Sequence, residues 1–312
     1  MSLTNYPNGL TSFGTVLPGL NGVGNVYYVW QSSKTAIMSD MVSKYGGNVY
    51  PDGSAILYQD AGDGLAIQAA INACKGGRND YVLVGTGNYN LTVPLTMAGK
   101  SSVHLIGING SGLEIGTVGA AALTQTGAYE NVIMEAYGEL TGFQIINKAG
   151  YSAVTMADGK WRANIHNNYF HMTQGTACSI ISAVGSGMSY GTIANNRFET
   201  WVAGAITSAI SCAGATAVTI NDNWINNYTG TMDVAINVGA GVQAMIIDNI
   251  VSDCGGAGVI TAGIDVGTGA KSTVIGNRFS MPTTTALSGG VADRTFSRNF
   301  DALAGGNVAI ES

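Results

Sequence analysis

The chain holds little of what several common kinds of protein depend on. Of its 312 residues only 10% are charged, five are proline and four are cysteine. The cysteines are widely spaced and form no CxxC pair, at Cys74, Cys178, Cys212 and Cys254. This spacing predicts neither a disulfide framework nor a zinc site, so we expect buried free thiols in a chain folded in a reducing compartment. We expect no metal and no cofactor.

Positive charge and long apolar runs are also scarce. The chain has 13 Lys plus Arg and a net charge of −6, which disfavours nucleic acid and anionic membranes as partners. No run of eighteen apolar residues occurs, and the first residues lack the basic and apolar regions of a secretory signal. We therefore expect no nucleic-acid partner and no membrane partner, and a protein made in the cytoplasm.

Glycine and a repeated phrase are abundant. The chain has 45 Gly, and 46% of its residues are hydrophobic, which is ample material for a core. Six phrases read apolar, two variable, Asn, variable and usually apolar, and their asparagines are Asn168, Asn196, Asn223, Asn249, Asn277 and Asn299. The steps between them are 28, 27, 26, 28 and 22 residues. Such a period indicates one supersecondary unit per copy that must stack on its neighbours.

The repeated unit has the pattern of short strands. Segments such as 217–220 and 272–275 alternate and are rich in β-branched residues, and Gly, Asn, Ser or Thr interrupts them at short intervals. Coiling about three strands per turn, with turns about 4.8 Å apart, predicts an all-β, right-handed parallel β-helix of about eight turns. We expect the six asparagines to lie in the αL conformation at a sharp corner and to bond to one another as a ladder.

The segments before and after the coil differ from it. Residues 1–62 are turn-rich and hold three of the five prolines, so we expect an N-terminal arm or attachment segment with one short strand over 25–30. A helix over 63–77, N-capped by Asp63 and ended by Gly76 and Gly77, should plug the first turn. The coil should then run to residue 281, with a last turn and tail over 282–312.

Four successive pieces resemble the opening of pectate-lyase-like right-handed β-helix proteins. These are the helix end at 69–73, the strand at 80–84, the Gly-Thr-Gly-Asn-Tyr turn at 85–89 and the strand at 105–107. The later Ile-x-x-Asn-x-Phe phrases resemble the rungs of that family, so the resemblance covers roughly 63–300. It implies the fold, but the family includes lyases, hydrolases and inert virion parts alike. The Asn-Tyr-Pro-Asn-Gly-Leu-Thr-Ser-Phe-Gly phrase at 5–14 resembles the N-terminus of some tailed-phage structural proteins that carry a β-helix.

Two acids occur at the position just before the ladder. That column reads Asn167, Asn195, Asp222, Asp248, Gly276 and Arg298. Asp222 and Asp248 should lie about 5 Å apart on adjacent turns. They are the candidates for a catalytic or calcium-binding pair, as the lyase and tailspike resemblance implies. The alternative is that a short polar side chain simply suits the turn, and no basic residue flanks the pair in the neighbouring columns. The three histidines, His104, His166 and His171, are scattered, and we expect them to be solvated or satisfied in the core rather than metal ligands.

The position just after the ladder forms an apolar and cationic column. It holds Tyr169, Arg197, Trp224, Ile250, Arg278 and Phe300. If these side chains point outward, the stripe could stack against the sugar rings of a host glycan or pack against a second copy of the chain. A third possibility is that the column is partly interior and fills the coil.

Taken together, these patterns favour a structural role. We expect a tailed-phage virion component, a capsid cement or decoration protein or a fibre, in which residues 1–62 dock on the capsid or tail and the coil projects as a homotrimer. No catalysis is required. The alternatives are a polysaccharide-degrading tailspike or lyase that uses Asp222 and Asp248, and a non-catalytic glycan-binding module that uses Tyr169 and Trp224.

Overall fold

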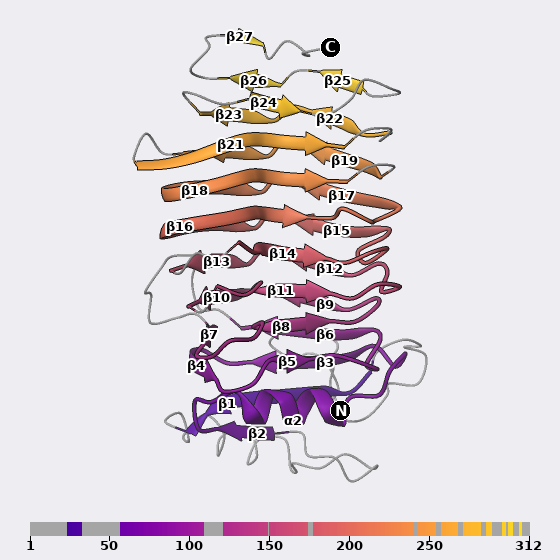
Figure 1. The fold of residues 1–312 in the computed structure, drawn as a ribbon. Helices are drawn as coiled ribbons and strands as arrows, with labels where there is room; N and C mark the ends of the chain where they lie inside the picture. Colours follow the sequence, from indigo (N-terminus) through magenta and orange to yellow (C-terminus); the bar gives the residue numbers. More distant parts are fainter. Residues whose placement is uncertain are drawn as a thin grey trace, which may run out of the picture.

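The chain forms a parallel β-solenoid of about eight turns, whose strands are stacked along one axis (Figure 1). The structure is a computed structural model, and it describes residues 24–32, 57–108, 121–148, 150–173, 177–239, 242–253, 257–267, 271–281, 285–288, 295–297, 299–301 and 306–307. The predicted all-β parallel β-helix is confirmed.

One face of the solenoid is an eleven-stranded parallel sheet, here called the first sheet. Its order is β2 (Leu57–Asp60), β1 (Val26–Gln31), β3 (Asp80–Val84), β6 (Val103–Gly107), β9 (Glu139–Thr141), β12 (Asn164–His166), β15 (Gly191–Ala194), β17 (Ala217–Asn221), β19 (Gln243–Ile247), β22 (Thr273–Ile275) and β25 (Thr295–Ser297). The strand expected at 25–30 is therefore present as β1, and it pairs with β3 of the coil.

The other faces belong to a sixteen-stranded second sheet. One row is β4 (Gly87–Leu91), β7 (Ala121–Gln125), β10 (Phe143–Asn147), β13 (Tyr169–Met172), β16 (Arg197–Ser211), β18 (Trp224–Val238), β20 (Ile250–Ser252), β23 (Arg278–Ser280), β26 (Phe300–Asp301) and β27 (Gly306–Asn307). The other row contains β5 (Leu95–Thr96), β8 (Val132–Met134), β11 (Val154–Met156), β14 (Ser179–Ala183), β21 (Ala257–Val266) and β24 (Thr285–Ser288). The two rows join because β16 and β18 are long enough to pair with both.

Because side chains alternate along a strand, the same apolar position points into the core in successive rungs. In the first sheet, one register column is fully buried and contains Ile165, Ile193, Ile220, Ile246 and Val274. In the second sheet, the rings of Phe170 and Phe198 stack with centroids 4.8 Å apart. A shift of one residue would turn these side chains to the outside, so the column fixes the register of each rung.

The predicted asparagine ladder is present and buried. Each carboxamide oxygen after that of Asn168 accepts hydrogen bonds from the backbone and the side chain of the preceding ladder asparagine; for example, Asn223 Oδ1 accepts from Asn196 N at 3.0 Å and from Asn196 Nδ2 at 3.1 Å. The same pattern links all six residues, Asn168, Asn196, Asn223, Asn249, Asn277 and Asn299. The ladder thus satisfies polar groups that burial would otherwise make costly.

The backbone conformation predicted for the ladder was assigned to the wrong residue. The αL position is the residue just before the first five ladder asparagines, with φ of 54° at Asn167, 53° at Asn195, 56° at Asp222, 53° at Asp248 and 72° at Gly276. The chain turns a corner there, between a strand of the first sheet and a strand of the second, and the carboxamide of the following ladder asparagine points inward.

The helix at the start of the coil is shorter than predicted and is capped differently. Helix α2 spans Leu65–Ala73, and its N-cap is Gly64 rather than Asp63. The buried Asp60, at the end of β2, accepts hydrogen bonds from the backbone amides of Gly62, Asp63 and Gly64 through Oδ1 and from that of Ala66 through Oδ2. A carboxylate supplied by the neighbouring strand therefore replaces a local cap.

The prediction of buried free thiols is confirmed for Cys74 and Cys212, whereas Cys178, which forms no disulfide with a described cysteine, is only half-buried. Burial raises the pKa of Cys74 and Cys212 to about 12. Cys254 lies outside the described residues. In the part of the chain that the structure describes, no helix is long and apolar enough to span a membrane.

Candidate functional site

The column after the ladder, here called the stripe, is one register column of the second sheet, and its middle part faces outward. Register pairing places Tyr169, Arg197, Trp224, Ile250, Arg278 and Phe300 on successive rungs. Trp224 and Ile250 are 43% and 40% exposed, and Arg278 is exposed as well. The outward orientation considered from the sequence is therefore correct for the middle of the stripe. Tyr169, by contrast, is buried.

A buried carboxylate explains why Tyr169 is covered. Glu199, in the next outward column of β16, accepts hydrogen bonds from Arg197 Nε at 2.8 Å, from the Tyr169 hydroxyl at 2.7 Å and from Trp201 Nε1 at 3.3 Å. A buried charge is tolerated only when it is paired in this way. Burial and the Glu199 hydrogen bond raise the pKa of Tyr169, and Glu199 raises the pKa of Arg197 despite the opposing effect of burial.

Aromatic rings surround this charge network. The Arg197 guanidinium carbon lies 4.6 Å from the centroid of Trp224 and 5.8 Å from that of Tyr169, which are cation–π distances. Trp201 and Tyr228 stack with centroids 4.0 Å apart at an interplanar angle of 12°. Trp201 and Tyr228 occupy the β-bulge where the pairing of β16 with β18 shifts register. The result is a rigid outer surface that combines indole faces with a fixed guanidinium.

One polar side chain beside the network has no partner within the described residues. Asn226 lies next to Glu199 in register, is 1% exposed, and neither its Oδ1 nor its Nδ2 has a hydrogen-bond partner. A buried amide in this state is costly unless water or a ligand supplies the missing bonds. Because the Asn226 amide is buried, the components of a binding site on this surface are the exposed aromatic rings and the positioned cation.

The acid pair predicted from the sequence occupies corner positions. Asp222 and Asp248 are exposed αL residues on adjacent turns, and Asp222 Oδ2 accepts a hydrogen bond from Asn221 Nδ2 at 2.6 Å. The other described residues of this column are Gly142, Asn167, Asn195 and Gly276. All are residue types that adopt αL readily. Neither carboxylate forms an ion pair with a described Lys, Arg or His.

The structure brings together two histidines that the sequence left apart. On the first sheet, Glu139 bonds to His104 Nδ1 at 2.6 Å and to His166 Nε2 at 2.7 Å. These two hydrogen bonds lower the pKa of Glu139 to about 2. The ring of Tyr81 stacks on His104 at 4.4 Å. His171 lies elsewhere, beside Tyr169 on the second sheet, where burial lowers its pKa.

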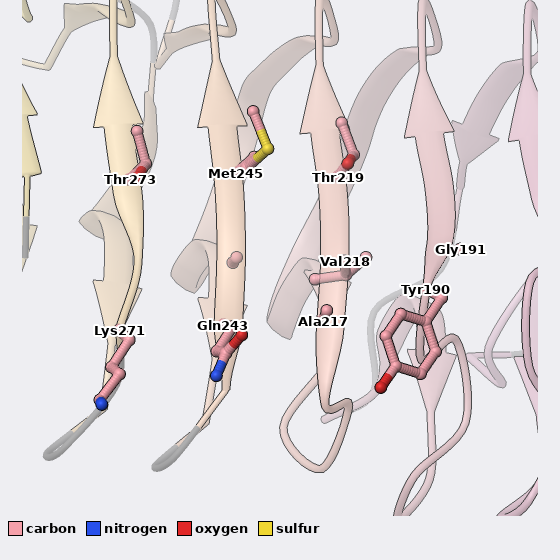
Figure 2. A pocket seen from close by; sticks show the side chains of 10 residues that line it. Tyr190, Gly191, Ala217, Val218, Thr219, Gln243, Met245, Lys271 and Thr273 are labelled. Carbon is pink, nitrogen blue, oxygen red and sulfur yellow. The ribbon is translucent and has the colours of Figure 1, made fainter.

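A shallow depression also lies on the first sheet, across β15, β17, β19 and β22. Its volume is about 410 Å³. Figure 2 shows Lys271, Gln243 and Tyr190 in one row at the strand starts and Met245 in a second row between two threonines. This depression was not predicted, because it depends on which rungs stand side by side.

Comparison of the chain with protein-family models, with curated proteins and with solved structures found no match. Within the ranges that the structure describes, no cluster of three or more His, Cys, Asp or Glu is arranged to hold a metal ion.

Proposed function

We propose that the protein is a structural, non-catalytic component of a tailed-phage virion. Its coil projects from the capsid or tail as a cement or decoration protein or a fibre, and residues 1–62 attach it to its capsid or tail partner. The observation that carries the proposal is the stripe, where Trp224 and Ile250 are exposed side by side between two arginines on a rigid coil. Exposed apolar patches of this kind mark interaction surfaces.

The stripe fits association between copies of the chain. Trp and Arg are enriched at the centres of protein interfaces, and a straight coil presents them along one line. Parallel coils arranged about a threefold axis would each bury the stripe against the next copy in a closed, heterologous contact. The resemblance of the phrase at 5–14 to tailed-phage proteins supports a virion, assembled from protein made in the host cytoplasm.

Two experiments test this proposal. Light scattering should find a trimer for the wild type and monomers for Trp224→Ser/Ile250→Ser, whereas Met245→Ser, an exposed apolar residue on the first sheet, should remain trimeric. A monomeric wild type would refute self-association. Removing residues 1–23 leaves β1 in place and should give a folded coil that no longer enters virions. Incorporation of this truncated chain would contradict attachment through the N-terminal segment.

A second candidate function is non-catalytic binding of a host glycan by the same surface. The exposed ring of Trp201, stacked on Tyr228, favours it, because sugar rings stack on aromatic faces. The enzymatic alternative rests on Asp222 and Asp248 alone. It would replace the present proposal if the wild type released reducing sugar from a bacterial polysaccharide and Asp222→Asn/Asp248→Asn did not.

A further inference from the structure

A second αL column lies at the opposite edge of the first sheet, where its strands begin. Register pairing stacks Asn79, Ser102, Tyr137, Arg162 and Tyr190, each two residues before a paired strand residue. Their φ angles are 65°, 60°, 58°, 55° and 60°. Backbone bonds confirm the stacking, since Tyr137 N donates to Trp161 O at 2.8 Å and Arg162 N donates to Ser189 O at 2.9 Å.

Three residues at this edge are of types that disfavour the αL conformation that they adopt. At the ladder corner, every described αL residue of the column is Asn, Asp or Gly. Here, three consecutive rungs place Tyr137, Arg162 and Tyr190 in αL, which bulky side chains rarely adopt. The fold does not demand large residues at such a corner, because the other edge forms without them. Strain of this kind concentrates at functional positions, so these side chains point to a task beyond folding.

The three side chains face solvent. Tyr137 and Tyr190 are 44% and 60% exposed, and Arg162 is exposed between them. The guanidinium carbon of Arg162 lies 5.7 Å from the centroid of Tyr137. Throughout the described ranges, no carboxylate pairs with Arg162. Although the net charge of the chain is −6, this arginine lies beside the ring of Tyr137 without a carboxylate partner among the described residues, so it is locally complementary to an anionic group.

The column continues into the depression on the first sheet. Tyr190 lies at one end of it, and Figure 2 shows Gln243 and Lys271 extending the same row, with Met245 farther along the strand of Gln243. Met245 is 50% exposed, and its flexible thioether can fit varied apolar groups. Tyr, Arg and Met are the residue types enriched at protein–protein interfaces, which favours a protein ligand over a sugar.

We propose that this corner is a docking site for an acidic segment of a partner protein. A carboxylate of that segment pairs with Arg162 at the level of Tyr137 and Tyr190, and an apolar side chain farther along the segment, three rungs away, rests on Met245 in the depression. Recognition is through side chains, because the corner backbone amides are already bonded to the next rung. The site is on the first sheet and the stripe on the second, so this inference does not depend on the proposed function.

Fluorescence anisotropy with the full chain tests the proposal. The probes are a short fluorescent peptide of alternating glutamate and leucine, which represents the partner segment, and a fluorescent oligogalacturonate, which represents an anionic glycan. We expect Arg162→Glu and Tyr190→Gly each to weaken peptide binding at least about tenfold, which is ~1.4 kcal/mol. The matched controls are Arg278→Glu, an exposed arginine on the second sheet, and Asn195→Gly, an αL residue at the ladder corner, and both should bind as the wild type does.

Thermal unfolding separates loss of the site from loss of the fold. Glycine adopts αL without strain, so Tyr190→Gly should unfold at the same temperature as the wild type or a higher one while it loses the peptide. Equal peptide binding by wild type, Arg162→Glu and Tyr190→Gly would overturn the proposal, as would no binding at all. Binding of only the oligogalacturonate, lost in the same two variants, would also overturn it and would make the corner a glycan site.

Discussion

Truncating one ladder asparagine should destabilise the coil severely. Asn223 Oδ1 accepts bonds from the backbone and side chain of Asn196, and its Nδ2 donates to Ile193 O at 2.9 Å and to Asn249 Oδ1 at 3.0 Å. In Asn223→Ala two buried groups lose these partners, the backbone N–H of Asn196 and the carbonyl of Ile193, whereas Asn196 Nδ2 still donates to Ile165 O. At about 1–3 kcal/mol for each unsatisfied buried group, the loss is about 2–6 kcal/mol.

Urea unfolding followed by circular dichroism measures this loss. A control at the next position is Asn195→Gly, because Asn195 is exposed and its αL backbone suits glycine, so we expect a change within ~0.5 kcal/mol. The reasoning fails if Asn223→Ala costs no more than Asn195→Gly. That result would mean that water replaces the carboxamide and that the ladder adds little to the core stacking.

Three further predictions concern charged groups. The pKa of Glu139 is lowered from 4.5 to about 2, so the ionised carboxylate contributes to the free energy of unfolding above pH 4.5, and this contribution is lost as the pH falls towards 2. Urea unfolding measured over this pH range should show a loss of at most about 3 kcal/mol in the wild type, and Glu139→Gln should not show it. Glu199→Gln leaves the partly exposed Arg197 charge without its partner and should cost about 1–3 kcal/mol in urea unfolding, unlike an exposed acid. Asp222→Gly and Asp248→Gly should not lower the thermal midpoint, since both residues are αL and exposed; a clear drop would show that the carboxylates hold the corner.

The sequence predicted the solenoid because the ladder period repeats through its second half. Aligning the asparagines also gave the register of both flanking columns, and pairing confirms it from Tyr169 to Phe300. It could not place αL correctly, because Asn occurs both at the ladder and just before it in the rungs of Asn168 and Asn196. Residue type alone does not distinguish a turn position from a buried one.

The alignment on asparagines could not predict the register of the first rungs. The rung before Asn168 has Gly142 and Phe143 where the ladder pair would stand, and Phe143 N donates to Asn168 Oδ1 at 3.1 Å. Without an asparagine to align, nothing in the sequence placed Glu139 between His104 and His166. The burial of Tyr169 was likewise hidden, because its hydroxyl bonds to Glu199, which belongs to the next rung.

A solenoid allows function to be separated from folding by comparing equivalent positions. Every rung has the same corners and columns, so at a position that the fold alone determines the residues should share one conformational or packing property, even where they differ in type. The ladder and the αL position before it follow this rule, and Asp222 and Asp248 therefore need no catalytic explanation. The stripe around Trp224 and the corner from Tyr137 to Tyr190 break the rule, one with exposed indole and one with backbone strain. Because they break it on different sheets, the two proposals together predict that the coil binds one partner through each face at the same time.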